Sequence, residues 1–301
     1  MVEPSVPILL IGYNRPNLLE NQINILRKIK PSKMYIAIDG PKKNHGEDTY
    51  LVEEARKKVD LVDWECNLST NFNIKNLGCA ETVQSAISWA FTDNEFLIIL
   101  EDDIEFNENF IKFCEKYLHQ HSSSELFGSI SGYQPINEEL IKFEERLLCS
   151  KYFSGWGWAT SREIWESYTT KNPKKINFSL FKIAQKYKFN ILLILFESYN
   201  LYLIKKGKLD TWDYQFSYFL YINNKLNIYP DKNLIKNIGF NSSGTHTKSP
   251  IKSIVFIEHD IMAFQPNHTS INVNPKFDKF MRKKMTRDIC NILKSKLLRK
   301  S

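Results

Sequence analysis

The chain has 301 residues, of which 43% are hydrophobic and 25% are charged, a composition typical of a globular protein. Its length suffices for one large α/β domain with a substantial core. Ten of the 41 basic residues, but only two of the 34 acidic residues, fall within residues 276–301. The rest of the chain is therefore close to neutral. This argues against binding of nucleic acid by the body of the protein through basic charge.

The cysteines and the first residues give an expectation of the compartment. Five cysteines form neither a CxxC pair nor a zinc-like spacing, so we expect reduced thiols and no structural zinc. The first residues have no basic segment followed by an apolar one of signal-peptide length, and no apolar stretch approaches a membrane span. We therefore expect a cytoplasmic protein.

The N-terminal part of the chain alternates short apolar runs with segments of helical spacing. We expect strands and helices in the order 6–13 (strand), 18–29 (helix), 34–38 (strand), 50–59 (helix), 64–72 (strand), 80–90 (helix) and 96–100 (strand). This alternation predicts an α/β fold with a mostly parallel, doubly wound sheet flanked by helices.

The pattern is less regular after the fourth strand. We expect short strands at 127–132 and 228–230, helices at 110–118, 162–168 and 191–202, and a further helix that begins near Asp213. No long linker or internal repeat interrupts the chain, which predicts one compact domain. Within it we expect a nucleotide-binding half at residues 1–130, an acceptor-binding half at 131–270 and a basic C-terminal helix at 271–301.

Three carboxylates, Glu101, Asp102 and Asp103, directly follow the apolar run Phe96–Leu100. Such a run suits a strand covered on both faces, and open α/β sheets bind ligands at the carboxyl ends of their strands. Two adjacent aspartates at that edge suit Mg²⁺ or Mn²⁺, which takes one or two protein carboxylates together with substrate phosphates and water. The alternative is a solvated acidic turn.

Two other stretches carry candidate ligand contacts. Residues 152–160 (YFSGWGWAT) place four aromatic residues around two glycines, so we expect an irregular segment in which Gly155 and Trp156 contact a ring-shaped ligand. Simple core packing is the alternative, and it applies with equal force to Trp158. Asp213 lies near a predicted helix N-terminus, where the helix dipole favours a carboxylate and capping is the alternative role.

In their order and spacing, these motifs resemble the GT-A fold of nucleotide-sugar glycosyltransferases. Leu100–Asp103 resembles the EDD form of the metal-binding DxD motif in N-acetylglucosaminyltransferase I and its relatives, and Asn76–Gly78 resembles the NxG of family 2 glycosyltransferases. Further segments are similar to those of bacterial members of this group: 155–158, 211–215, and 237–239 with His246. The resemblance spans about residues 6–247.

The resemblance implies transfer of a sugar from a nucleotide-sugar donor, expected to be a UDP-sugar, to a hydroxyl of a bacterial surface glycan or glycolipid. It implies Mn²⁺ or Mg²⁺ bound by Asp103, with His246 as second protein ligand, bridging the two phosphates as a Lewis acid. Asp102 is then expected near the ribose or the donor sugar, with Glu101 orienting either one. The remaining donor-binding residues that the resemblance implies are Tyr13, Asn14, Arg15, Asp39, Asn76 and Gly78.

In the acceptor half, the resemblance implies a catalytic carboxylate. Asp213 falls where the base of inverting members occurs, and it would take the proton of the acceptor hydroxyl. Family 2 members usually present Glu-Asp here, whereas this chain has Trp212–Asp213, so Asp210 is a rival for the role. The acceptor itself is expected to contact Gly155, Trp156 and Trp212.

Two other functions compete with this one. A sugar nucleotidyltransferase shares the sheet and the acidic strand end, but it normally needs a glycine-rich phosphate loop after the first strand, and residues 12–16 (GYNRP) have too few glycines. A non-catalytic sugar-binding module would use the aromatic residues but would leave the acidic cluster without a task.

The C-terminal segment has apolar residues at steps of three and four, with basic residues between them. This pattern predicts a basic amphipathic helix. Such a helix can lie on an anionic membrane surface, which would place the protein at the inner face of the membrane. The alternative is a helix that packs on the body with its basic face in solvent.

Overall fold

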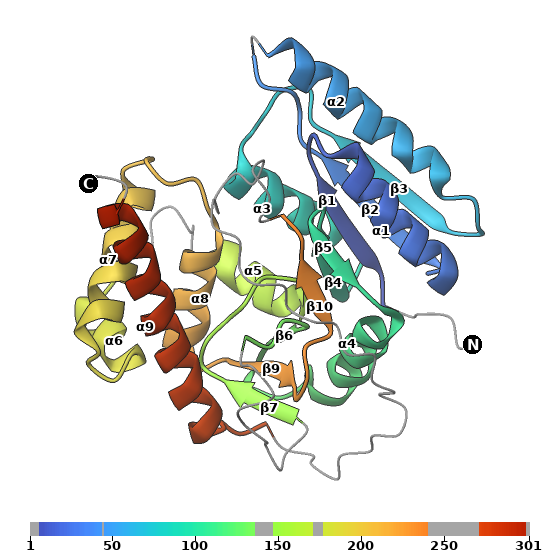
Figure 1. Ribbon diagram of the computed structural model, residues 1–301. Helices are drawn as coiled ribbons and strands as arrows, with labels where there is room; N and C mark the ends of the chain where they lie inside the picture. The colour runs from blue at the N-terminus through green and yellow to red at the C-terminus, as the bar shows by residue number, and fades with distance from the viewer. Residues whose placement is uncertain (1–5, 44, 136–146, 171–176, 240–270, 299–301) are drawn as a thin grey trace.

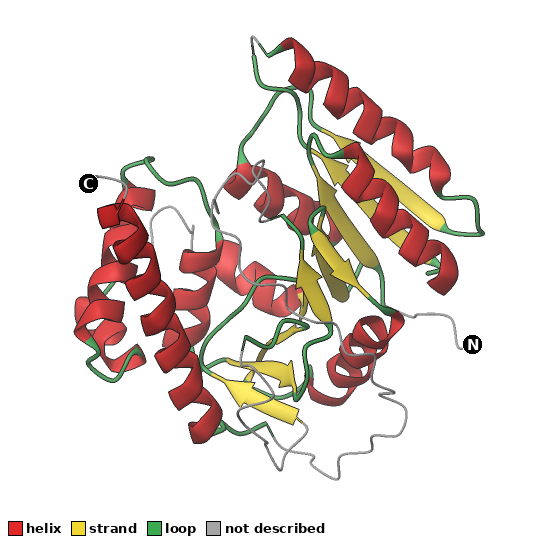
Figure 2. Ribbon diagram, viewed as in Figure 1, coloured by secondary structure: helices red, strands yellow, loops and turns green. Residues whose placement is uncertain are grey.

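The computed structural model describes residues 6–43, 45–135, 147–170, 177–239 and 271–298. Residues 295–298 are described by their backbone alone. They form an α/β fold around an eight-stranded sheet of order β3-β2-β1-β4-β8-β6-β9-β7. Helices flank this sheet, and a second group of helices gathers beside its far end (Figure 1, Figure 2). The predicted α/β fold class is therefore confirmed.

The first half of the sheet is entirely parallel. Its strands are β1 (Ile8–Gly12), β2 (Lys33–Ile38), β3 (Asn67–Phe72) and β4 (Phe96–Glu101). The connecting helices are α1 (Pro16–Ile29), α2 (Gly46–Lys57), the 3₁₀ turn η1 (Lys58–Leu61) and α3 (Cys79–Ala90). Every residue of β1 is buried, whereas the edge strand β3 has only exposed and half-buried positions. The apolar sequence of β1 predicts this complete burial.

The second half of the sheet is mixed. Antiparallel β8 (Trp158–Ser161) separates β4 from β6 (Phe127–Ser131), after which β9 (Leu226–Pro230) runs parallel to β6 and β7 (Leu147–Ser150) closes the edge antiparallel. The expectation that residues 152–160 are irregular throughout is corrected: the segment ends in a central strand. A two-stranded sheet of β5 (Ile104–Phe106) and β10 (Ile235–Asn237) lies directly after the acidic residues.

Four of the helices in this half begin at side-chain caps. Their bounds are α4 (Glu108–His121), α5 (Arg162–Thr169), α6 (Leu180–Lys186), α7 (Ile191–Lys205), α8 (Asp213–Ile222) and α9 (Pro275–Leu298). In α4 to α7, an asparagine or serine oxygen accepts a hydrogen bond from a first-turn N–H: Asn107, Ser161, Ser179 and Asn190. Such caps satisfy N–H groups that the helix leaves unpaired. Helix α6 was not predicted, because only a few apolar residues follow Ser179.

The predicted C-terminal helix is present as α9, and its apolar side packs on the body. Phe277, Met281 and Ile289 are buried in a second core between the helix group and strands β7 and β9. Asp278 is 5% exposed, and its carboxylate accepts a hydrogen bond of 2.6 Å from Ser150 Oγ on β7. Figure 1 shows α9 lying along α7. Among the described residues, no helix combines the length and the apolar character that a bilayer span needs.

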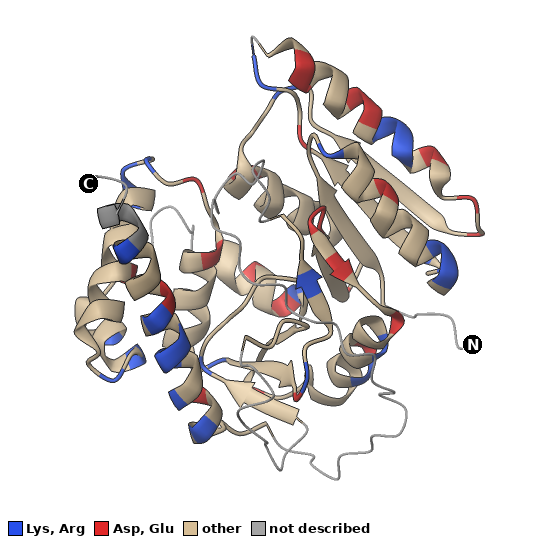
Figure 3. Ribbon diagram, in the orientation of Figure 1, with Lys and Arg blue, Asp and Glu red and all other residues tan. Residues whose placement is uncertain are grey.

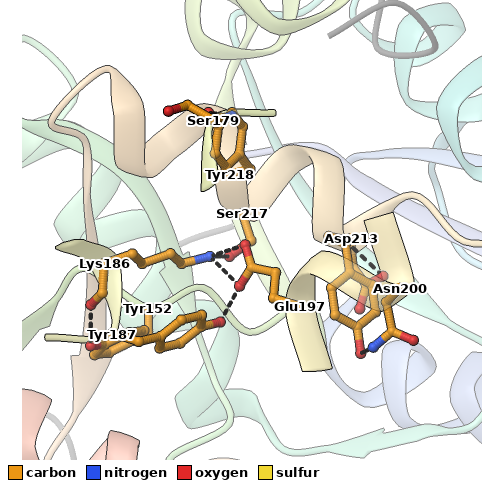
Figure 4. Close-up of polar contacts among 10 residues, drawn as sticks. Tyr152, Ser179, Lys186, Tyr187, Glu197, Asn200, Asp213, Ser217 and Tyr218 are labelled. Carbon is orange, nitrogen blue, oxygen red and sulfur yellow. Dashed lines mark hydrogen bonds and ion pairs between the residues drawn. The ribbon is translucent and has the colours of Figure 1, made fainter. Parts of the chain in front are cut away.

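A buried ion pair lies inside the helix group (Figure 4). Lys186 Nζ on α6 is 3.0 and 3.1 Å from the two carboxylate oxygens of Glu197 on α7, and the two side chains are 1% and 2% exposed. Lys186 also donates to Ser217 Oγ on α8 at 3.0 Å, and the Tyr187 hydroxyl donates to Glu197. Because removal of one partner leaves a charge buried without compensation, this pair holds α6, α7 and α8 in register.

Lys186→Met is expected to lower the free energy of unfolding by about 3–5 kcal/mol, because Glu197 would keep a buried charge without its partner. The double variant Lys186→Met/Glu197→Leu should recover most of the loss, since it removes both charges. Urea denaturation followed by circular dichroism measures both. Lys57→Met, which removes the exposed pair with Glu54, is the matched control and should change little. An equal effect in Lys186→Met and the control would contradict this assignment.

Candidate functional site

A cavity of about 360 Å³ opens at the carboxyl ends of β1, β2 and β4. This is the edge where α/β sheets bind ligands, and the volume is that of a small-molecule site. It is lined by most of the residues that the sequence singled out: Tyr13, Arg15, Asp39, Asn76, Gly78, Glu101, Asp102, Asp103, Trp156 and Asp210. The fold thus brings the predicted donor residues, except Asn14, together around one cavity.

The acidic turn after β4 is paired with an arginine from the loop after β1. Arg15 Nη1 lies 3.1 Å from Asp102 Oδ1 and 3.2 Å from Asp103 Oδ2. The backbone N–H of Tyr13 donates to Asp102 Oδ2 at 3.3 Å. Arg15 therefore places a cation directly against the two aspartates at the end of β4.

A side chain of α1 and the backbone that follows β10 hold this turn in place. Gln22 on α1 is 2% exposed, and its Nε2 donates to the carbonyl oxygens of Glu101 (2.5 Å) and Ile104 (2.8 Å). The N–H of Ile238 donates to the Asp103 carbonyl at 2.8 Å, and a Cβ added at Gly239 would overlap with the Asp103 carboxylate. Sequence analysis missed Gln22, although an amide on the apolar face of a predicted helix is a signal for a buried polar contact.

Burial and mutual repulsion disfavour negative charge on the acidic turn. Burial raises the pKa of Glu101 to about 8, with further increases from Asp103, Asp102 and Asp213. Burial also raises the pKa of Asp102 to about 6, although Arg15 opposes this shift. The pKa of Asp103 is raised for the same reason, again against Arg15. The turn thus gains from any further cation that binds beside it.

Asp39 at the end of β2 organises the entrance to helix α3. Its carboxylate is 4% exposed and accepts hydrogen bonds from the N–H groups of Leu77 (3.0 Å) and Gly78 (3.2 Å) and from Asn76 Nδ2 (2.8 Å). Gly78 has a φ of 85°, a conformation that favours glycine. Asp39 and Asn76–Gly78, which the sequence analysis treated as separate motifs, therefore form one unit.

Asp210 spans the two halves of the domain. Its carboxylate accepts hydrogen bonds from the backbone N–H groups of Cys79 (2.7 Å) and Ala80 (3.0 Å), so it caps α3 from the loop that precedes α8. Asp213 is the first residue of α8, where Oδ1 accepts from Thr211 Oγ1 at 2.5 Å and from the Tyr214 N–H at 3.0 Å. Asp210 lines the cavity, whereas Asp213 lies outside that lining but close enough to raise the pKa of Glu101.

Asp48 on α2 fixes the loop after β1, and sequence analysis gave it no role. It accepts hydrogen bonds from the Tyr13 hydroxyl (2.5 Å), from Asn14 Nδ2 (2.6 Å) and from the Lys42 N–H (2.7 Å). Burial opposes ionisation of Asp48, but these hydrogen bonds outweigh it and lower its pKa. Lys42 also lines the cavity. Asn14, predicted as a donor contact, is thus engaged with Asp48, and Tyr13 shares that partner.

The predicted aromatic contacts divide between the cavity and the core. Trp156 lines the cavity and packs on Tyr133, with ring centroids 4.5 Å apart. Trp158 is 1% exposed, in line with the core alternative, and Trp212 is 3% exposed and stacks on it at 5.2 Å. A Cβ at Gly155 would lie 3.2 Å from the Trp212 ring, which explains why glycine suits this position. Trp212 therefore shapes the loop from inside the core.

The residues present suit a cation that is shared with substrate phosphates. Within the described part of the chain, no group of three or more histidine, cysteine or acidic side chains is placed to enclose a metal ion. His246, the predicted second ligand, lies outside the described residues. Asp102 and Asp103 nevertheless offer oxygen ligands and already hold the Arg15 cation between them. Mg²⁺ and Mn²⁺ use such a pair when phosphates complete their coordination.

No family model matches the sequence. Among solved structures, the chain is similar to GalNAc-T7 with UDP, GalNAc and Mn²⁺, at 12% identity and a TM-score of 0.45, over 75% of this chain and 42% of that one. It is also similar to UDP-glucose pyrophosphorylase complexed with UDP-glucose (12% identity, TM-score 0.34, 54% and 78% coverage) and to HddC from Yersinia pseudotuberculosis (13%, 0.32, 54% and 80%). The chain thus spans less than half of GalNAc-T7. The strand order itself shows an α/β fold whose acidic residues lie at the carboxyl end of β4.

Glu101→Gln should flatten the pH dependence of stability. In the folded protein the pKa of Glu101 is about 8, against 4.5 ordinarily, so the folded state holds a proton that the unfolded chain releases. The free energy of unfolding should therefore fall as pH rises from about 4.5 to about 8, and the fall above pH 6 should shrink in Glu101→Gln. Urea unfolding of the metal-free protein across this range measures it.

The matched control is Glu105→Gln on the exposed side of β5, which should keep the wild-type profile. If Glu101→Gln and wild type lose stability in parallel between pH 6 and pH 8, Glu101 is ionised in the folded protein and the assignment is wrong.

Proposed function

We propose that this protein is a metal-dependent glycosyltransferase that moves a sugar from a nucleotide-sugar donor, a UDP-sugar in the first instance, to a hydroxyl acceptor. One observation carries the proposal. The aspartate pair after β4 and the unit that Asp39 forms with Asn76–Gly78 face a single cavity of about 360 Å³. Acids with an adjacent cation on one side and a polar turn on the other suit the diphosphate and the nucleoside of such a donor.

The chain supplies two cations to the donor. Arg15 lies against the acidic turn, and Lys42 lines the same cavity on the side of Tyr13, with its Nζ 5.6 Å from the centre of that ring. A diphosphate placed between them is neutralised by both, and the tyrosine ring offers a flat surface for a base. Residues 1–130 thus form the donor half of the proposal.

Asp102 and Asp103 would hold Mn²⁺ or Mg²⁺ beside the diphosphate, and His246 is the candidate for a further ligand. When bound, this ion neutralises the charge that develops on the departing nucleoside diphosphate. Asp103 is the better placed of the two for this contact with the leaving group, since Asp102 also receives the Tyr13 N–H and so is anchored toward β1. Glu101 helps to orient the turn, because its backbone carbonyl accepts a hydrogen bond from Gln22 Nε2.

The acceptor half, residues 131–270, would supply the base for an inverting transfer. Both oxygens of Asp210 are engaged by backbone N–H groups of α3, which suits a positioning role. Asp213 begins α8 beside Glu101, and its Oδ1 is oriented by Thr211. We assign the base to Asp213, with Trp156 and Gly155 at the acceptor side. A glycan or glycolipid is the class of acceptor that this reading implies.

A sugar nucleotidyltransferase would use the same strand end, but it normally needs a glycine-rich phosphate loop after the first strand, and residues 13–15 between β1 and α1 contain no glycine. The two activities differ in their products. Release of a nucleoside diphosphate supports the proposal, whereas release of pyrophosphate from a nucleoside triphosphate and a sugar phosphate supports the alternative.

Asp103→Ala is expected to abolish metal-dependent hydrolysis of the donor and to weaken donor binding in the presence of Mn²⁺, because the metal contributes to donor affinity as well as to the leaving group. A screen of UDP-, GDP- and dTDP-sugars, read as nucleoside diphosphate released with and without Mn²⁺, identifies the donor. Asp63→Ala, at an exposed aspartate paired with Arg27, is the matched control. Near wild-type turnover of Asp103→Ala in Mn²⁺ would refute the proposal.

Asp213→Asn is expected to lower the turnover number by roughly a hundredfold or more, the usual worth of a positioned base, with little change in donor affinity. Asp210→Asn should act mainly on donor affinity, because it weakens the cap of α3 that adjoins Asn76–Gly78. Steady-state kinetics and donor titration of both variants separate the effects. Should Asp210→Asn give the larger loss of turnover with donor affinity intact, the two roles must be exchanged.

A further inference from the structure

Helix α7 exposes four large apolar side chains along one face. Ile191, Leu195, Tyr199 and Tyr202 are 73%, 63%, 60% and 55% exposed. Steps of four, four and three residues place them on one face of the helix. A helix on the surface of a globular protein normally shows polar residues to solvent and apolar residues to the core. Helix α7 departs from this pattern, since it buries Leu193 and Leu201 in the core but also exposes this second apolar face.

Two polar side chains of α7, Glu197 and Asn200, point the other way, into the protein (Figure 4). Glu197 is 2% exposed in its pair with Lys186, and Asn200 is 9% exposed and donates from Nδ2 to the Tyr214 hydroxyl at 3.1 Å. Rotation of α7 about its axis would break both contacts and carry a buried charge away from its partner. The buried polar side therefore fixes the apolar side in solvent.

Neighbouring residues extend this surface. Leu180 and Phe181 on α6 are each 62% exposed, and Phe189 in the turn between α6 and α7 is 64% exposed. Helices α6 and α7 pack against each other. We define the α6–α7 face as these seven residues: Leu180, Phe181, Phe189, Ile191, Leu195, Tyr199 and Tyr202. A single exposed apolar residue is ordinary, but a group of this size on two packed helices indicates a binding surface.

The exposed charges of α6, α7 and the turn between them have one sign. Within residues 177–208, all of them described, Glu197 is the one acidic residue, and it is buried. The exposed charged residues of this stretch are lysines: Lys182, Lys188, Lys205, Lys206 and Lys208. Figure 3 shows them toward both ends of the helix pair. The surface therefore fits an occupant that is apolar inside and anionic at its boundary.

We propose that the α6–α7 face docks the protein on an anionic membrane surface. The aliphatic and phenylalanine side chains would enter the boundary between headgroups and acyl chains, the tyrosines would lie at headgroup level, and the lysines would meet lipid phosphates. A second copy of the chain is a poor occupant, because a two-fold contact would bring two lysine sets together. In this proposal the α6–α7 face, and not the C-terminal helix, binds the membrane, because Phe277, Met281 and Ile289 of α9 are packed in the core.

Sedimentation of the full chain with vesicles tests this proposal. The protein should pellet with phosphatidylglycerol–phosphatidylcholine vesicles at low salt, less at high salt, and little with phosphatidylcholine alone. Leu195→Ser/Tyr199→Ser and Lys205→Glu/Lys206→Glu should each lower the partition coefficient on the order of tenfold or more. Circular dichroism verifies that both variants fold, as their exposed positions predict.

The matched controls are Tyr50→Ser, an equally exposed apolar residue on α2, and Ile292→Ser on α9, which is 42% exposed. Both should bind vesicles as the wild type does. The proposal is overturned if the intact protein does not pellet with anionic vesicles, if the α6–α7 variants bind as the controls do, or if Ile292→Ser gives the larger loss. Light scattering that shows a dimer, dissociated by Leu195→Ser/Tyr199→Ser without any vesicle binding, overturns it in favour of a second copy.

Discussion

The pairing of one guanidinium with two carboxylates is the constraint on which the cavity depends. Glu101, Asp102 and Asp103 end a buried strand in succession, so their charges repel one another where little water can screen them. Arg15 offsets part of this repulsion, and it reaches the acids because β1 and β4 are neighbours in the parallel sheet. The loop after β1 must then be held firmly, which is the task of Asp48.

The second element of the site is built from backbone polarity. The N–H groups at the start of α3 are shared between two carboxylates, Asp39 from β2 and Asp210 from the far half of the chain. Helix N-termini carry partial positive charge, and carboxylates placed there are favourable. The result is a turn whose shape is set by both halves of the domain, so the cavity exists only when both are folded.

Much of the fold and part of the site could be predicted from local pattern. Apolar runs with helical spacing between them determine the parallel half, and the acids after Leu100 follow from their position at a strand end. The rest depends on contacts that no local pattern encodes. Asp210 meets Cys79 across 131 positions, Trp212 turns inward because Trp158 is there to stack on, and β8 becomes a central strand because β4 and β6 both offer it partners. Helix α7 reads as a core helix by composition, and its orientation is set by Lys186.

Strand β8 joins the parallel half of the sheet to its mixed half through backbone hydrogen bonds, with β4 on one side and β6 on the other. A continuous ladder of this kind resists bending between its strands far more than a linker between two domains does. The strands whose carboxyl ends line the cavity therefore belong to one rigid sheet. The parallel and mixed halves of this sheet are not free to rotate about a hinge. Changes in the width of the cavity entrance must therefore come from the loops at the edge of this sheet, such as those that contain Trp156 and Asp210. The acidic residues after β4 keep their spacing.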